Sequence, residues 1–228
     1  MSGKASLKLT GECLNGCSGC EIALLDMGEK FLDLLKMIEI VHLPLFMDSK
    51  HGRPSAETSG IKLPTADIGL LSGSIKTSDH QQVADAVRHA CEIVVAFGTC
   101  AAYGGIPALA NSYWNKDLME TCFQTRGTGK TEEYPSDLVP ELTRSCMAID
   151  QQIHVDLYLP GCPPHPDHIF RTLEGIVKKQ LFVLPEKSVC DKCPAIREGK
   201  GQVKRLKRPL ELPDWKVFQN SGESVRCF

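Results

Sequence analysis

The sequence predicts an α/β protein built on a doubly wound parallel sheet. Short apolar segments alternate with amphipathic segments along most of the 228-residue chain. The segment 92–98, EIVVAFG, is almost continuously apolar, which is typical of a strand buried on both faces of a parallel sheet. Because the connections between strand and helix candidates are short, this alternation favours parallel strands in one sheet with helices packed against it.

Five segments are predicted to be strands. They are 6–10, 38–43, 66–73, 92–98 and 153–160. Each combines apolar residues with a length that suits a strand, and Pro44 ends the second of them. Helical patterns follow the first, third and last, so the order along the chain is that of a parallel sheet.

Three helices are predicted. They cover about 20–38, 78–90 and 166–179. In the first, apolar residues recur every three or four positions, which marks a helix with one buried face. In the second, Ser78 and Gln81 have the form of a capping box. The third has Asp167 in its first turn and two lysines in its last, the polarity that a helix dipole favours.

The composition indicates a soluble globular protein. Of its residues, 42% are hydrophobic and 24% charged, which is enough to bury one sizeable core. Charged residues interrupt even the most apolar segment, 31–47, so no membrane span is expected. The formal net charge of −2 argues against a nucleic-acid-binding protein. We expect a main domain at 1–184 and a short, loop-rich, cysteine-bearing tail at 185–228.

The chain contains eleven cysteines, and their use is the main functional question. A disulfide framework fits poorly, because the number is odd and the chain is far longer than scaffolds that depend on disulfides. The first ten residues, MSGKASLKLT, contain neither an apolar run nor a twin arginine. We therefore expect a cytoplasmic protein with reduced thiols, in which clustered cysteines bind metal or take part in redox chemistry.

Four cysteines are expected to meet at one edge of the sheet, because ligands of such sheets lie beyond the carboxyl ends of the strands. These four rim cysteines come from three strand-to-helix loops: Cys17 and Cys20 from the first, Cys100 from GTCAAYGG, and Cys162 from PGCPP. Four thiolates suit an iron–sulfur cluster or a closed zinc site. The glycines and prolines beside them would let the backbone approach a bulky inorganic group.

Three motifs in this order, CSGCE, GTCAAYGG and PGCPPHP, closely resemble the small, electron-transferring subunit of nickel–iron hydrogenases. The cytosolic methyl-viologen-reducing and sulfhydrogenase branch is the most similar. The resemblance covers essentially the whole chain. It implies a flavodoxin-like domain in which the four rim cysteines hold a proximal [4Fe–4S] cluster. It also implies a separate large subunit with the nickel–iron centre, and a flavin or iron–sulfur protein as the redox partner.

The tail carries a second part of the resemblance. The stretch SVCDKCPAIREGK contains Cys190 and Cys193, and Cys227 lies next to the last residue. In this family the tail supplies a further cluster, but three cysteines leave it incomplete in this chain. The sequence is therefore interpreted as a fragment, or as a chain with a short tail whose metal site is shared, altered or absent. Zinc is a further alternative for the Cys-x-x-Cys pair.

Other classes of protein remain as alternatives. The related cluster subunit of complex I and of membrane-bound hydrogenases typically has adjacent cysteines after the first strand, whereas two residues separate Cys17 from Cys20. A flavin-binding carrier would have a phosphate loop rich in serine and threonine at this place. A dihydrogen sensor would share the same cluster-binding residues and differ only in its partner.

Several residues near the motifs have structural interpretations. Glu21 is expected to be a favourable carboxylate in the first turn of a helix, rather than a proton relay at a subunit interface. His165 is interpreted as a helix cap or surface histidine, with tuning of the cluster as the alternative. Tyr113 and Trp114 are expected to anchor a long insertion at 111–150.

The remaining thiols are given no role in binding. Cys13 is interpreted as a core or loop thiol that lies close to the motifs. Three others lack companions at ligand spacing and are predicted to be small buried hydrophobic residues: Cys91, Cys122 and Cys146.

Overall fold

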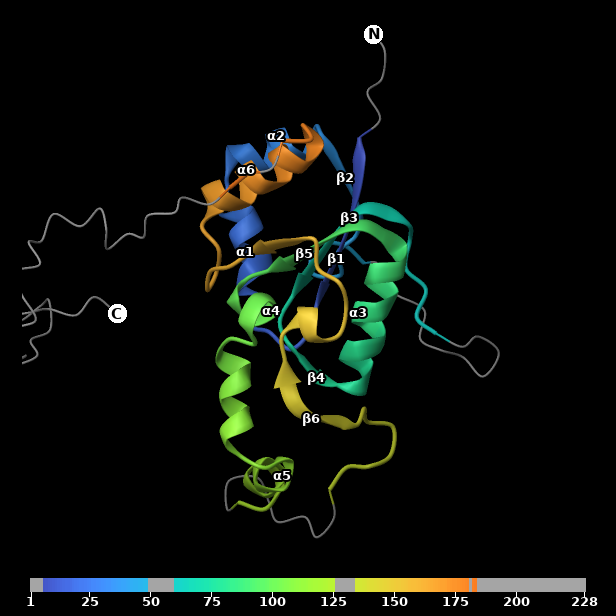
Figure 1. Ribbon diagram of the computed structural model, residues 1–228, viewed down its shortest axis with the longest axis vertical. Helices are drawn as coiled ribbons and strands as arrows, with labels where there is room; N and C mark the ends of the chain where they lie inside the picture. The colour runs from blue at the N-terminus through green and yellow to red at the C-terminus, as the bar shows by residue number, and fades with distance from the viewer. Residues whose placement is uncertain (1–5, 49–59, 126–133, 181, 184–228) are drawn as a thin grey trace, which may run out of the picture. The chain divides into compact units, whose positions relative to one another are not determined.

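Five parallel strands form the central sheet of the fold (Figure 1). Its order is β2-β1-β3-β5-β7, and every neighbouring pair runs parallel. The strands are β1 (Leu7–Cys13), β2 (Ile38–His42), β3 (Ala66–Ser72), β5 (Cys91–Phe97) and β7 (Leu157–Leu159). The predicted α/β class and the parallel sheet are therefore confirmed, and each strand overlaps one predicted segment.

The computed structural model describes residues 6–48, 60–125, 134–180 and 182–183. The predicted tail at 185–228 lies outside the described residues, and so do the three cysteines it carries: Cys190, Cys193 and Cys227. Within the described ranges, no helix is both long enough and apolar enough to cross a membrane.

Helices cover both faces of the sheet (Figure 1). On one face lie α1 (Gly19–Leu25), α2 (Glu29–Leu35) and α6 (Pro166–Val177), and on the other lies α3 (Ser78–Ala90). Each helix buries one apolar stripe against the strands, as its periodicity predicts. This cover on two sides is the doubly wound arrangement.

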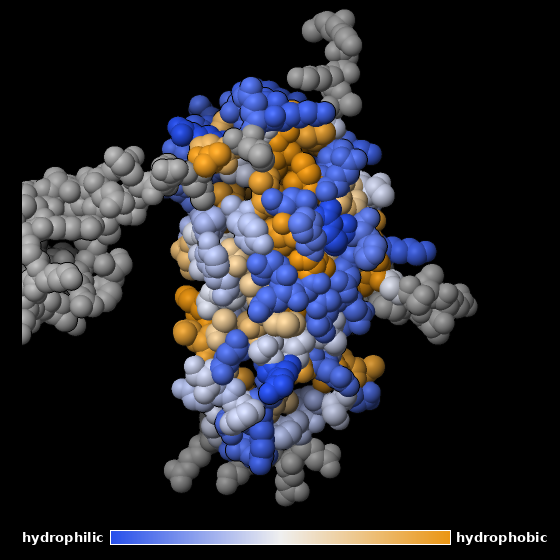
Figure 2. Space-filling model, in the orientation of Figure 1, coloured by the Kyte–Doolittle hydropathy of each residue, from blue (hydrophilic) through white to orange (hydrophobic). Residues whose placement is uncertain are grey.

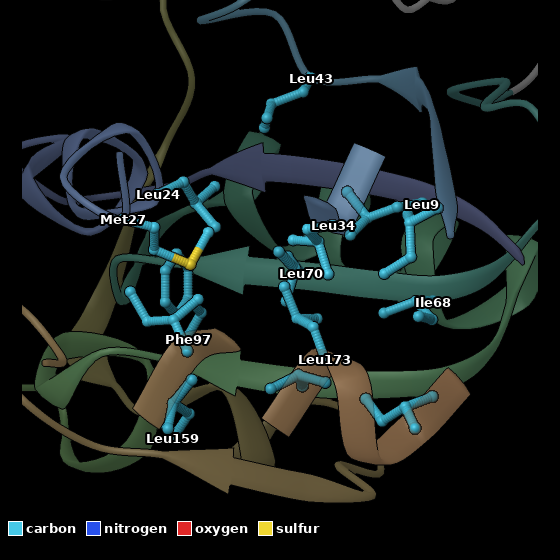
Figure 3. Close-up of a cluster of buried hydrophobic side chains, with 14 of the residues drawn as sticks. Leu9, Leu24, Met27, Leu34, Leu43, Ile68, Leu70, Phe97, Leu159 and Leu173 are labelled. Carbon is cyan, nitrogen blue, oxygen red and sulfur yellow. The ribbon is translucent and has the colours of Figure 1, made fainter. Parts of the chain in front are cut away.

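The core consists of one apolar cluster on each face of the sheet. Figure 3 shows the cluster under α1 and α6, where Leu24, Met27 and Leu173 meet Leu70 and Phe97 of the central strands. All five side chains are almost completely buried. Full burial of each such side chain stabilises the fold by about 1.5–3 kcal/mol. The two clusters together therefore hold the helices against the two faces of the sheet.

The predicted helix at 20–38 is wrong in its continuity, because the structure has two helices there. The chain turns between α1 and α2 at Gly28, which has a φ of 60°. Residues 36–37 close a turn, and Ile38 already begins β2. Apolar spacing continued across the break because Met27 and Leu34 both contribute to the same core cluster.

The predicted capping box of α3 is also wrong. Thr77 is the N-cap, and its Oγ1 accepts the His80 N–H at 3.3 Å. Ser78 instead pairs with the backbone of Glu141, since its N–H donates to the Glu141 carbonyl at 2.9 Å and its Oγ accepts the Glu141 N–H at 3.2 Å. Ser78 therefore makes a contact across more than 60 residues in place of the predicted capping hydrogen bond.

Strand β7 is shorter than the predicted segment 153–160. Residues before Leu157 do not pair with β5 as a strand, because the Asp156 side chain, and not a backbone carbonyl, accepts the hydrogen bond from the neighbouring strand. Its Oδ2 accepts the Val94 N–H at 2.8 Å, while its own N–H donates to the Val94 carbonyl at 2.9 Å. Ile153 and Val155 are nevertheless buried in the cluster on the α3 face.

The insertion at 111–150 contains regular structure that the sequence did not reveal. Neither helix α5 (Asn115–Phe123) nor strand β6 (Leu142–Met147) is among the predicted elements. Strand β6 pairs antiparallel with β4 (Ile75–Thr77) in a separate two-stranded sheet. Two further short elements lie between β5 and α5, namely α4 (Thr99–Tyr103) and the 3₁₀ helix η1 (Ile106–Ser112).

Arg88 ties α3 to the edge of the sheet opposite the rim cysteines. Its guanidinium donates to Asp156 Oδ2 at 2.5 Å and to three backbone carbonyls, those of Cys91, Glu92 and His154. Burial raises the pKa of Asp156, but the Val94 N–H and the Arg88 guanidinium more than offset burial and hold this pKa below its usual value. The planar fork of arginine suits this set of acceptors, which lysine could not satisfy.

Replacing Arg88 by alanine is expected to lower the free energy of unfolding by about 2 kcal/mol at neutral pH, because a charged donor to four acceptors is lost. Since the folded pKa of Asp156 is depressed, the part of the stabilisation that comes from Asp156 is present above its ordinary pKa of about 3.9 and is lost as the pH falls through the folded value. In urea titrations the difference between the two proteins should therefore shrink in acid, while the part from the three carbonyl contacts remains. Equal unfolding free energies at neutral pH would contradict this role of Arg88.

Candidate iron–sulfur site

The four rim cysteines lie at the carboxyl ends of three strands of the central sheet. Cys17 lies in the loop after β1, and Cys20 lies in the first turn of α1. Cys100 lies in the first turn of α4, directly after β5, and Cys162 follows β7. Because β1 and β5 flank β3 and β7 borders β5, all three loops leave the sheet at the same edge. The sequence therefore predicted the placement of these residues correctly.

The rim cysteines form an inner and an outer pair. Cys20 and Cys100 are partly buried, whereas Cys17 and Cys162 are exposed. All eight cysteines in the described part of the chain carry free thiols. The site thus combines two thiols set into the protein with two that face outwards.

The thiols lie close enough to affect one another electrostatically. Burial, the Glu21 carboxylate and the thiols of Cys100, Cys17 and Cys13, in that order, raise the pKa of Cys20 to about 12. Burial also raises the pKa of Cys100, with smaller contributions from Cys162 and Cys17 and an opposing one from the Ile106 N–H. Deprotonating several of these thiols together is therefore unfavourable unless a positively charged group binds them.

The backbone around the thiols leaves no room for larger residues. A Cβ built on Gly98 would overlap the Cys20 sulfur, and one on Gly105 would lie 2.7 Å from the Cys100 sulfur. Ser18, between Cys17 and Cys20, has a left-handed φ of 62°, and the Cys162–Pro163 peptide bond is cis. This cradle of thiols and bare backbone fits an inorganic cluster, which is the group that the donor set suits.

Glu21 is buried, which the sequence did not reveal. It lies in the first turn of α1, as expected, but it is only 2% exposed. Its Oε1 accepts a short hydrogen bond from the Ser72 hydroxyl, and its Oε2 is buried with no hydrogen-bond partner in the described structure. Its expected place in the first turn of a helix is therefore confirmed, whereas its burial could not be read from the sequence.

The other cysteines divide into three kinds. Cys91 and Cys146 are buried, as predicted, whereas Cys122 is exposed on α5 and the prediction for it is wrong. Cys13 ends β1 with its sulfur 3.6 Å from the Ser18 hydroxyl, which places it beside the rim cysteines. His165 is the N-cap of α6, and its Nδ1 accepts the Asp167 N–H, so the capping interpretation is confirmed.

An exposed apolar surface follows Cys100 along the chain. Its side chains are 64–76% exposed, and they belong to Tyr103, Ile106, Leu109, Tyr113 and Trp114. Tyr113 and Trp114 do not anchor the insertion in the core of this chain, and anchoring against a partner stays a prediction. Figure 2 shows that apolar side chains also reach the surface at several separate places on the face in view. We call the five residues the apolar surface after Cys100.

The fold and this edge define a class of protein: a doubly wound parallel α/β domain that gathers four free thiols from three strand-end loops. Residues 17–176, which include all four rim cysteines, match the family described as NADH ubiquinone oxidoreductase, 20 Kd subunit. The chain belongs to this family.

Curated proteins that are similar to this chain include hydrogenase subunits. A subunit of the F420-non-reducing hydrogenase vhu of Methanococcus voltae is 37% identical over 87% of this chain and 65% of its own length. The iron-sulfur subunit of the F420-non-reducing hydrogenase of Archaeoglobus profundus is 34% identical over 92% of this chain and 71% of its own length. This chain thus spans roughly two thirds of either relative, slightly less for the first.

A solved structure has the same fold. One chain of an NAD+-reducing [NiFe]-hydrogenase in the H2-reduced state superimposes with a TM-score of 0.71 at 28% identity. The match covers 80% of this chain and 97% of that chain. The fold described here therefore corresponds to nearly all of that hydrogenase chain.

Proposed function

We propose that this chain is the iron–sulfur electron-transfer subunit of a nickel–iron hydrogenase. The observation that carries this proposal is the convergence of four free thiols from three strand-end loops on one edge of the sheet. Cys17, Cys20, Cys100 and Cys162 would hold a [4Fe–4S] cluster. The names of these relatives, both of them hydrogenase subunits, support the assignment to a hydrogenase.

The chain's own residues would bind, orient and shield the cluster. Cys20 and Cys100 would hold it from the partly buried side, and Cys17 and Cys162 from the exposed side. Gly98 and Gly105 keep the backbone close to the two inner sulfurs. When bound, such a cluster supplies one-electron redox chemistry at a potential set by its surroundings. The protein itself breaks no bond in dihydrogen.

A single zinc ion is the alternative for the rim cysteines. In a tetrahedral site with Zn–S bonds of about 2.3 Å, the sulfurs lie only about 3.8 Å apart. In the described residues, no three His, Cys, Asp or Glu side chains lie close enough together to hold one metal ion. A cluster with several iron atoms holds its four thiolates further apart than zinc does, and the metal analysis below distinguishes the two.

The catalytic nickel–iron centre would belong to a separate large subunit. The apolar surface after Cys100 supports docking of such a partner, because exposed aromatic and aliphatic side chains beside a site are typical of protein interfaces. Electrons would pass between the large subunit and a flavin or iron–sulfur protein. We place this assembly in the cytoplasm, which the unpaired thiols of the described residues support.

The alternatives differ in their partner or in the group they bind. The family description includes a subunit of NADH ubiquinone oxidoreductase, so a complex I-like or membrane-hydrogenase subunit is the nearest alternative. The two residues between Cys17 and Cys20 and the names of the relatives favour a cytosolic hydrogenase. A dihydrogen sensor would differ in its partner alone, and a flavin carrier would bind flavin at this edge in place of a cluster.

A second cluster in the tail is a further part of the proposal. Cys190, Cys193 and Cys227 supply three of the four thiolates that such a cluster needs. The tail would form a separate region at 185–228, following the cluster domain at 1–184. Completing the site would require one more ligand from elsewhere.

The test is the content of iron, acid-labile sulfide and zinc per chain, measured on protein purified without oxygen together with any large subunit that co-purifies. About four iron and four sulfide per chain are expected for the rim cluster alone, and about eight of each if the tail completes a second cluster. Zinc without sulfide would overturn the electron-transfer role. Bound flavin without iron would support the carrier instead.

A further inference from the structure

A polar network with a buried centre, Ser74 and Cys146, lies beneath two of the loops that carry rim cysteines. It consists of Asn15, Ser74, Cys146 and Asn111, which we call the anchor network. Its members come from the loop after β1, the connection from β3 to β4, strand β6 and the 3₁₀ helix η1. These segments lie up to 131 residues apart in the sequence.

The first half of the network fixes the loop that leads to Cys17. Asn15 and Ser74 exchange two backbone hydrogen bonds, each 3.0 Å long. The Asn15 side chain donates to Ser74 Oγ at 3.4 Å, and the Ser74 hydroxyl lies 3.0 Å from the Cys146 sulfur. Ser74 is completely buried and Cys146 is 4% exposed, so water cannot replace these contacts.

Close backbone contact reinforces this half. A Cβ on Gly73 would lie 2.8 Å from the Asn15 backbone, and one on Gly16 would lie 3.1 Å from the Gly73 Cα. The loop before Cys17 is therefore pressed directly against the connection after β3.

The second half leads to Cys100. The Asn111 side chain donates to the Cys146 carbonyl at 2.9 Å and accepts the Cys146 N–H at 2.7 Å. Asn111 lies near the end of η1, and Gly105 at the start of the same helix packs against Cys100, since a Cβ on Gly105 would lie 2.7 Å from the Cys100 sulfur. Cys146 thus connects, through one side chain on each flank, to the loops of two rim cysteines.

We infer that the anchor network sets the position of Cys17 relative to Cys100, and so controls how tightly and in what geometry the cluster is held. The inference rests on the proposed function, because it concerns a cluster bound by these thiols. Ser74 and Cys146 would be positioning residues, since they act through the loops rather than by touching the bound group. Groups that orient metal ligands commonly change metal affinity by about 10–100-fold when removed.

The test compares Ser74→Ala and Cys146→Ala with Cys91→Ala in the intact, cluster-loaded protein. Cys91 is a similarly buried thiol, but it lies at the start of β5, whereas Cys100 follows the end of this strand. The measurements are the rate of iron release to a chelator and the electron paramagnetic resonance spectrum of the reduced cluster. We expect release about tenfold faster and a changed spectrum for both network variants, and wild-type values for Cys91→Ala.

Cys146→Ser keeps a hydrogen-bonding group at the same place, so it should restore most of the wild-type rate and spectrum. A role in packing alone would lower the melting temperature of all three alanine variants and leave release and spectrum unchanged, which would overturn the inference. A wild-type protein without any cluster would overturn the proposed function and this inference with it. A loaded wild type and unaffected network variants would overturn the inference alone.

Discussion

Substitution of Cys17 by serine is expected to remove the cluster and abolish electron transfer in the complex. A serine hydroxyl is a poor ligand for iron in a cluster, which is held by soft thiolates. Cys17 is exposed, so its loss should change the free energy of unfolding by no more than about 0.5 kcal/mol. Iron and sulfide per chain should fall from about four each to well below one, while the unfolding transition of the apoprotein stays where it was.

Cys13→Ser is the matched control for this substitution. Its sulfur lies beside the same loop, 3.6 Å from the Ser18 hydroxyl, but its place at the end of β1 is not one of the proposed ligand positions. We expect this variant to keep its iron, its sulfide and its electron transfer. Full cluster content in Cys17→Ser would disprove the ligand assignment, and a loss of cluster in Cys13→Ser would add Cys13 to the ligand set.

The placement of the rim cysteines could be predicted because it follows from topology. Strand candidates ahead of Cys17, Cys100 and Cys162 are recognisable from local apolar patterns, and parallel strands necessarily end at one edge. No knowledge of side-chain packing is needed for this step. The motifs then indicate the family, which the match over residues 17–176 shows.

Features that depend on distant contacts could not be predicted. Strand β6 pairs with β4 across more than 60 residues, and its exposed, polar pattern gives no periodic signal. Ser78 leaves its cap position for Glu141, and Asn15 meets Ser74 at a separation of 59 residues. The spacing of residues within a short segment contains no information on such pairs, because they form only when distant segments meet in the folded chain.

Burial of polar side chains was equally hidden. The place of Glu21 in the first turn of a helix was predictable from local pattern, but its burial and its bond to Ser72 of a distant strand were not. In the same way, the sequence did not show that Tyr113 and Trp114 remain exposed in this chain. Glu21 directly follows a rim cysteine, and near a functional site a sequence departs from ordinary burial patterns when function requires it.

Gly98→Ala is expected to prevent stable cluster binding although it removes no ligand. Gly98 has a φ of 93°, and an added Cβ would overlap the sulfur of Cys20. The sulfur is partly buried, so it cannot move aside without disturbing α1 or the loop after β5. We expect cluster affinity to fall at least about tenfold, measured as iron retained after exposure to a chelator.

The control for backbone strain is Gly28→Ala. Gly28 also has a positive φ, of 60°, but nothing lies within 4 Å of its added Cβ. Both variants place alanine in a backbone region that is nearly restricted to glycine and costs about 1–3 kcal/mol, so both should lose stability in urea, with the larger loss in Gly98→Ala because of its overlap with Cys20. Only Gly98→Ala should lose iron. If both variants keep their cluster, the close approach of Gly98 to Cys20 is irrelevant to binding. If both lose it, the effect is one of general stability, and the cradle around the rim cysteines is less tightly fitted than its geometry indicates.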